Sequence, residues 1–151
     1  MKRFFDLTFK PFFVITGLGT TLATLNAFWP QWSAEKILLI PFNQDYTIIL
    51  QHWGITVGLM GVFMIVAAFV AEWRDPILIY SALEKAFMVY LVVINASRPY
   101  ARGFWVGAVM DATVVLYTIS YFAVGGFHYV FNKPDVLRTA DTSSVLTKET
   151  R

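Results

Sequence analysis

Four long apolar segments dominate the pattern of hydrophobic and polar positions along the chain. They cover about residues 11–29, 47–73, 76–96 and 104–131, and each is bounded by charge, Pro or Gly. A helix of about 20 residues crosses the hydrocarbon core of a bilayer, so each segment is long enough to span it. None shows the strict alternation of a membrane β-barrel strand. The pattern predicts an all-α integral membrane protein, a four-transmembrane-helix bundle that forms a single domain over residues 1–131.

The longest connection follows the first span and contains the sequence SAEKILLI. Ser33 could cap a short helix there, and the apolar side chains of that helix would hold it in the membrane interface. These side chains are Ile37, Leu38 and Ile40. Residues 132–151 form a polar tail of mixed charge that is rich in Ser and Thr. We expect this tail to be disordered on its own.

Composition supports the membrane assignment. Hydrophobic residues make up 57% of the 151 residues and charged residues only 15%, whereas soluble domains carry about 45–50% and 25%. A soluble domain of this size could not bury so much apolar surface, so the lipid bilayer is the expected partner. The chain has no Cys, which excludes thiolate metal sites and a Cys nucleophile. A net charge of +2 is too small to indicate a nucleic-acid partner.

The distribution of Lys and Arg predicts the orientation. Eight of the 12 basic residues lie on the side of the N-terminus, three on the opposite side and one within a span. The positive-inside rule then places both termini in the cytoplasm, with a bacterial inner membrane or an equivalent energy-transducing membrane as the expected location. The tryptophans fall at the ends of spans, as in an aromatic belt; they could also form a rim for a pigment or a quinone head group. These residues are Trp29, Trp32, Trp53, Trp73 and Trp105.

Small residues indicate how the helices could meet. Without a hydrophobic driving force between helices in lipid, small residues at four-residue spacing mark the surfaces that approach closely. The second span has such a stripe at Gly54, Gly58 and Gly61, the first span has Gly17, and the fourth has Gly107. Two interpretations stay open: packing within this chain, or a docking face for a helix of another protein.

Three ionisable residues, Glu84, Lys85 and Asp111, lie deep within the spans. A single charge at the centre of a membrane helix costs about 2.5–3.5 kcal/mol, so these residues need partners or neutralisation. A helix rises 1.5 Å per residue, which puts Lys85 and Asp111 roughly 6–8 Å apart along the membrane normal. A Lys side chain can reach across that gap. We therefore predict a Lys85–Asp111 ion pair.

Glu84 is the carboxyl left over from that pair. It shares a helix stripe with Ser81, Met88 and Asn95, and without a cation we expect it to be protonated because burial disfavours the charged form. Three interpretations stay open. Glu84 could belong to a structural polar cluster with Ser81 and Asn95, it could form a proton or quinone-hydroxyl site, or it could pair with a neighbouring subunit.

The two histidines lie at opposite ends of the spans, His52 in the second and His128 in the fourth. They are too far apart to ligate one haem. Either could be a polar anchor or the single axial ligand of a pigment such as bacteriochlorophyll, and His52 is the candidate we retain. The carboxylates do not cluster as a metal site would require. We predict no catalytic residue, no metal and no firm cofactor; quinone, a chlorophyll or a lipid are the ligands to test.

The layout resembles that of small four-helix membrane proteins of the broad DoxX-like kind. The likeness covers about residues 11–131: a long first outer loop, a Gly-rich second span, HWGITVGLMG, and a polar third span, SALEKAFMVY. The resemblance implies a four-helix membrane fold and, for some members, a link to quinone-coupled oxidation.

Three functions follow as expectations. The first is a non-catalytic accessory subunit of a larger respiratory, photosynthetic or oxygenase complex, which would pack through small-residue faces and the intramembrane polar cluster. The alternative is a quinone-linked membrane redox component with a site near Glu84, Lys85 and Asp111. The third is a proton-coupled transporter that uses the same residues; four helices without half-helix breaks make it the weakest of the three.

Overall fold

The computed structural model of the chain describes residues 2–126, which are almost entirely helical and contain no strand. The four long helices are α1 (Lys2–Thr21), α4 (Thr47–Phe69), α5 (Ala71–Ile94) and α6 (Trp105–Tyr121). Two short helices, α2 (Leu25–Phe28) and α3 (Pro30–Lys36), lie between α1 and α4. Single turns complete the path: the 3-10 turns η1 (Leu22–Thr24), η2 (Gln44–Tyr46) and η3 (Pro99–Phe104), and the π-turn η4 (Phe122–Gly126).

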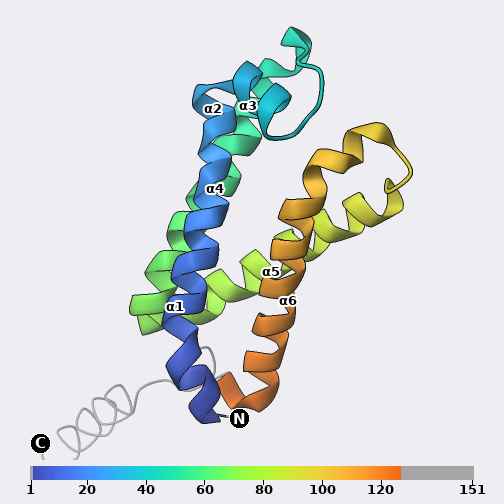
Figure 1. Cartoon of the computed structure of the whole chain (residues 1–151). Coiled ribbons are helices and arrows are strands. Elements are labelled where there is room, and N and C mark those ends of the chain that lie inside the picture. The colour runs from blue at the N-terminus through green and yellow to red at the C-terminus, as the bar shows by residue number, and fades with distance from the viewer. Residues whose placement is uncertain (1, 127–151) are drawn as a thin grey trace, which may run out of the picture.

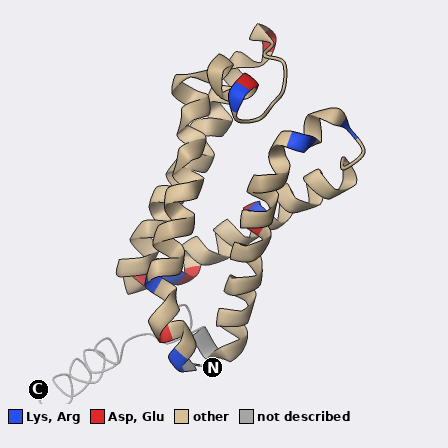
Figure 2. Ribbon diagram, in the orientation of Figure 1, with Lys and Arg blue, Asp and Glu red and all other residues tan. Residues whose placement is uncertain are grey.

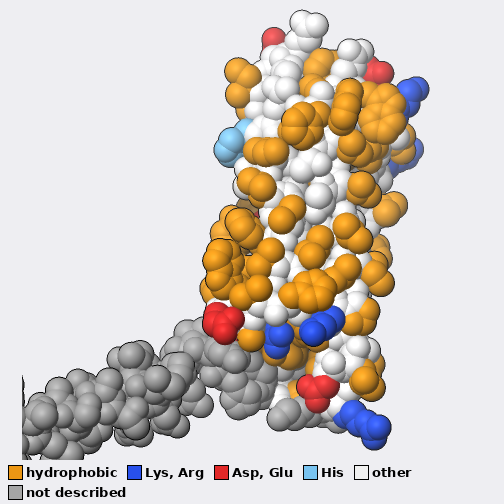
Figure 3. All heavy atoms as spheres, turned by 90° about the vertical axis from the view of Figure 1, so that its left-hand side faces the viewer, with side chains coloured by type: hydrophobic (Ala, Val, Ile, Leu, Met, Phe, Trp, Pro, Cys, Tyr) orange, Lys and Arg blue, Asp and Glu red, His pale blue; other side chains and the backbone are white. Residues whose placement is uncertain are grey.

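Four helical segments are long and apolar enough to cross a membrane, as the sequence pattern predicts. They are Arg3–Phe28, Gln44–Phe69, Ala71–Ile94 and Pro99–Val124. Charged residues gather at the two ends of the molecule, apart from one group midway along it (Figure 2). Hydrophobic side chains cover the face between the ends (Figure 3). The all-helical class is therefore confirmed, and the four candidate spans are those of a multi-pass membrane protein by length and composition; the side that faces the cytoplasm stays a prediction.

The helix boundaries differ from the predicted spans near two prolines. α1 begins at Lys2, so Pro11 lies within the helix. α4 ends at Phe69, one extended residue follows, and α5 begins at Ala71, so Pro76 also lies within a helix. A Pro removes one helical hydrogen bond, and membrane helices tolerate that loss when neighbouring groups satisfy the freed carbonyl. The predicted end of the fourth span at 131, His128 and the tail lie outside the described residues.

The short helix between α1 and α4 exists, but Ser33 does not cap it. Pro30 starts α3, because its fixed φ suits the first helical turn, and the helix ends at Lys36. Ile37 and the apolar residues after it therefore follow the helix instead of forming its apolar face. Ser33 lies in the middle of α3, fully buried, and its hydroxyl donates a hydrogen bond of 2.7 Å to Asn26 Oδ1.

The long helices form two pairs (Figure 1). α1 lies along α4, and α5 packs against α6. The start of α1, the α4–α5 junction and the end of α6 lie at one end of the molecule, which we call the N-terminal end. α2, α3 and η3 lie at the opposite end, which we call the loop end. The chain thus crosses between the two ends four times.

The two pairs join at the N-terminal end through an apolar and aromatic core. Phe9, Phe13, Leu78 and Val114 belong to it and are almost completely buried. The ring of Tyr117 stacks on Phe12 with 4.0 Å between centroids, and its hydroxyl lies 2.8 Å from that of Thr8. These residues come from α1, α5 and α6, so the core holds the pairs together. Toward the loop end the pairs diverge (Figure 1).

Candidate functional site: the buried ion pair and the loop-end cavity

Four glycines lie at the contact between the first helical segment and α4. A methyl group added at Gly61 would lie 2.5 Å from the carbonyl oxygen of Gly17, and one added at Gly54 would lie 2.8 Å from the carbonyl oxygen of Ala23. A methyl group on Gly58 would collide with Thr24. The backbones therefore approach so closely that no larger residue fits, as small-residue packing requires.

Gly107 does not share this role, so of the two interpretations given for the small residues, packing within the chain does not apply to it. A methyl group added there would meet no atom of the described residues within 4 Å. The close approach that was not predicted lies nearby, at Gly103 in η3, where a Cβ would collide with the backbone of Leu38. Spacing along a helix identifies small residues, but only the rotation of the helix decides which of them meet a neighbour.

The predicted contact between Lys85 and Asp111 is present. Lys85 Nζ on α5 donates a hydrogen bond of 2.6 Å to Asp111 Oδ1 on α6, and the Lys85 side chain is only 1% exposed. Glu84 Oε2 lies 4.0 Å from the same nitrogen. The group is the set of charges midway along the molecule in Figure 2. Asp111 neutralises Lys85 directly, and Glu84 stands beside the pair.

Polar oxygen atoms around this pair are left without hydrogen bonds. Glu84 Oε2 and the hydroxyls of Ser81 and Thr118 are buried and make none within residues 2–126. Ser81 and Glu84 are three residues apart on α5 and are therefore neighbours on its surface. Because buried polar atoms are almost always satisfied, these oxygens are available to a proton, a water molecule or a partner.

Asn95 lies outside this cluster, although it shares a helix stripe with Glu84. Asn95 caps the C-terminal end of α5, where its amide donates to Leu91 O (2.9 Å) and its Oδ1 accepts from the Tyr100 hydroxyl (2.9 Å). Eleven residues of helix separate it from Glu84 by roughly 16 Å along the axis. Residues on one stripe of a helix point in the same direction, but they can lie at different heights along the helix axis.

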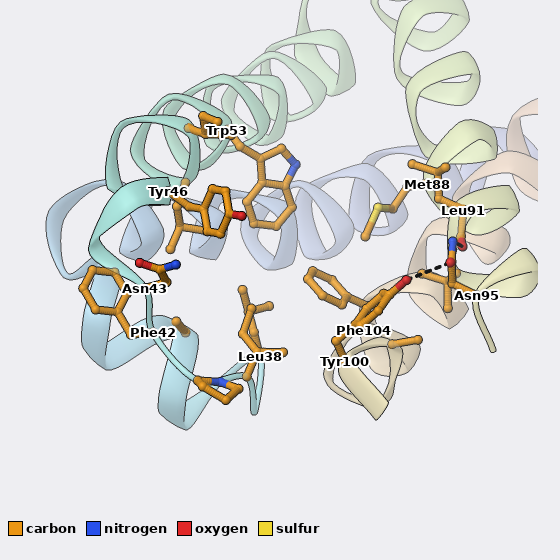
Figure 4. Close-up of a pocket in the computed structure, with 17 residues that line it drawn as sticks. Leu38, Phe42, Asn43, Tyr46, Trp53, Met88, Leu91, Asn95, Tyr100 and Phe104 are labelled. Carbon is orange, nitrogen blue, oxygen red and sulfur yellow. Dashed lines mark hydrogen bonds between the residues drawn. The ribbon is translucent and has the colours of Figure 1, made fainter. Parts of the chain in front are cut away.

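A cavity of about 500 Å³ lies at the loop end between the two diverging pairs. Tyr46 and Trp53 stand on one wall, and Tyr100 and Phe104 stand on the other (Figure 4). Met88, one turn beyond Lys85 on α5, also lines it. Among residues 2–126, no charged side chain lines this cavity. The cavity was not predicted from the sequence. Its one signal there is the tryptophan rim, since Trp53 lines the cavity and is the only one of the five tryptophans that is partly buried.

His52 does not face the cavity. Its side chain is exposed on the side of α4, and its carbonyl accepts the Thr56 hydroxyl at 2.8 Å. The structure brings no other candidate ligand to it. Residues 2–126 also contain no group of three His, Asp or Glu side chains placed to hold a metal ion.

Comparison of the chain with protein-family models, with curated proteins and with solved structures finds no match. The DoxX-like likeness therefore stays a resemblance of layout, and the site has to be interpreted from its own chemistry.

Proposed function

We propose that this chain is a small non-catalytic accessory subunit of a larger membrane complex of the respiratory, photosynthetic or oxygenase type. The observation that supports this proposal is the position of Glu84. Its side chain is 28% exposed on the flank of α5 at mid-height, and one of its carboxyl oxygens makes no hydrogen bond within the described chain. A carboxyl at this depth is costly when it faces lipid alone.

The surroundings of Glu84 have the form of a helix-docking face. Tyr80 and Phe87, one turn away on either side, are 55% and 61% exposed, and Leu83 is 68% exposed. A neighbouring helix laid on this face would cover these apolar side chains. A hydroxyl, amide or cationic group on that helix would bond to the exposed part of the Glu84 carboxyl, while its buried Oε2 faces Lys85 Nζ at 4.0 Å.

Gentle detergent extraction from native membranes, followed by native mass spectrometry, tests the proposal. We expect the wild-type chain to be extracted with partner subunits, and Glu84→Leu to lose them. Val106→Leu on α6, which is 84% exposed and far from Glu84 in sequence, is the matched control and should keep them. Extraction of the wild-type chain as a monomer without partner proteins would refute the proposal.

A second candidate, a quinone-linked redox component of electron transport, is favoured by the unpaired oxygens beside Lys85 and Asp111. Glu84 and Ser81 could exchange a proton or a hydrogen bond with a quinone oxygen there. We expect Glu84→Gln to slow quinone turnover by the purified chain, because the amide cannot donate the proton of a carboxylic acid. Unchanged turnover would remove Glu84 from that role.

A further inference from the structure

The walls of the loop-end cavity differ in their hydrogen-bonding capacity. On the wall formed by α5 and η3, the polar groups are already used: Tyr100 donates to Asn95, and Asn95 donates to Leu91. On the opposite wall, the hydroxyl of Tyr46 and the indole N–H of Trp53 make no hydrogen bond within residues 2–126. The cavity therefore presents free donors on one side only.

Apart from Asn43, whose Oδ1 accepts from Asp45 N, the rest of the lining is apolar and aromatic. The rings of Trp53 and Phe104 come from opposite walls and meet edge to face, with 6.3 Å between centroids. Figure 4 shows the Trp53 ring directed toward the space between the walls, with the Tyr46 hydroxyl beside that ring. A flat ring can stack on such side chains, whereas a phosphate would find no cationic partner there.

The position of the cavity suits a molecule that arrives through lipid. Ile49 and Leu91 line it and are also 68% and 37% exposed on the outside of the helices, so the lining continues onto the apolar surface. The cavity volume of about 500 Å³ falls within the 300–1,000 Å³ typical of small-molecule sites. A ring could occupy the cavity while an attached hydrocarbon tail stays in the bilayer.

We propose that this cavity binds one uncharged, lipid-soluble ring compound with carbonyl oxygens, the class to which quinones belong. A carbonyl oxygen accepts a hydrogen bond from the Trp53 N–H, the Tyr46 hydroxyl is a second donor on the same wall, and the ring lies against Phe104. The proposal concerns binding alone and rests on neither a partner subunit nor turnover. It places the ring at the loop end, one turn of α5 beyond the Lys85–Asp111 pair, and not at the pair itself.

Binding of decylubiquinone to the full chain in nanodiscs tests the proposal, with calorimetry as the readout. Trp53→Phe keeps the ring and removes the donor, so we expect affinity to fall roughly fivefold. Leu50→Trp fills the cavity and should weaken binding at least tenfold. Ile48→Trp is the matched control, because Ile48 lies on the same helix, is 81% exposed and does not line the cavity; it should leave affinity unchanged.

Two outcomes would overturn the proposal. Equal quinone uptake by wild type, Leu50→Trp and Ile48→Trp would mean partition into the bilayer. Displacement of the quinone by added phosphatidylglycerol would mean that the cavity is a phospholipid site. If Leu50→Trp does not fold, Trp53→Phe decides, and an unchanged affinity in that variant refutes the hydrogen bond. Binding without turnover would uphold this proposal while refuting the redox function, so the two can fail separately.

Discussion

The α1–α4 pair and the α5–α6 pair are held together by different contacts. Along α4, Gly54, Gly58 and Gly61 let the backbones touch, and the Gln51 amide adds a hydrogen bond of 2.9 Å to Ala27 O. Between α5 and α6, the Lys85–Asp111 side-chain pair makes the polar contact, and Gly107 does not bring the two helix backbones close together. Lipid supplies no hydrophobic force between helices, so each pair needs either close packing or a polar bond.

The two pairs also differ in how far these contacts extend along their helices. The glycine contacts extend along α4 from Gly61 to Gly54, so the first pair stays close toward the loop end. The second pair is tied by an ion pair midway along its helices, and it diverges from the first pair at the loop end. The cavity occupies the resulting space. One ion pair holds two helices together at a single height, whereas a stripe of small residues holds them together along several turns.

The largest effect is expected from breaking the ion pair. Asp111→Asn leaves Lys85 as an unneutralised buried cation, and we expect the free energy of unfolding in mixed micelles to fall by about 3 kcal/mol. The double variant Lys85→Met, Asp111→Leu removes both charges and should recover most of the loss. If Asp111→Asn loses nothing, Glu84 has replaced Asp111, and adding Glu84→Gln should then reveal the full loss.

A smaller effect is expected from the glycine contact. Gly61→Ala places a methyl group 2.5 Å from backbone atoms of α1, which should lower the free energy of unfolding by about 1–3 kcal/mol. Gly107→Ala is the same substitution without a neighbour, and it should be neutral or stabilising because Ala is the better helix former. Equal effects at the two positions would show that the pairs do not differ in the way described.

The smallest effect is expected where the pairs meet. Tyr117→Phe keeps the ring stacked on Phe12 and removes only the hydroxyl that lies 2.8 Å from Thr8. Hydrogen bonds between membrane helices contribute about 0.6 kcal/mol on average, so a loss of that order is expected in the same unfolding assay. Tyr80→Phe, at an exposed hydroxyl, is the control. A loss above that of Gly61→Ala would make this junction the dominant contact.

The sequence was most predictive for properties that depend only on the height of a residue along its helix. Helix rise is constant, so the depths of Lys85 and Asp111 follow from counting residues, and their contact was correctly expected. Predictions were wrong where the local preference of a residue was overridden by its tertiary contacts. Pro76, where the predicted third span begins, lies inside α5, and Ser33, the predicted cap, lies within α3 and its hydroxyl donates to Asn26.

The sequence by itself determined the solvent, the four long helices and the depth of each charge, because apolar length and a fixed helix rise require nothing beyond the chain order. Only the tertiary structure decided which helices pair and how each is rotated. Gly61 and Gly107 are chemically identical, but a methyl group added at Gly61 would meet the backbone of α1, and one added at Gly107 would meet no atom of residues 2–126 within 4 Å. The cavity arises in the same way: its walls come from α4, α5, η3 and the loop after α3, and it lies where the two pairs diverge.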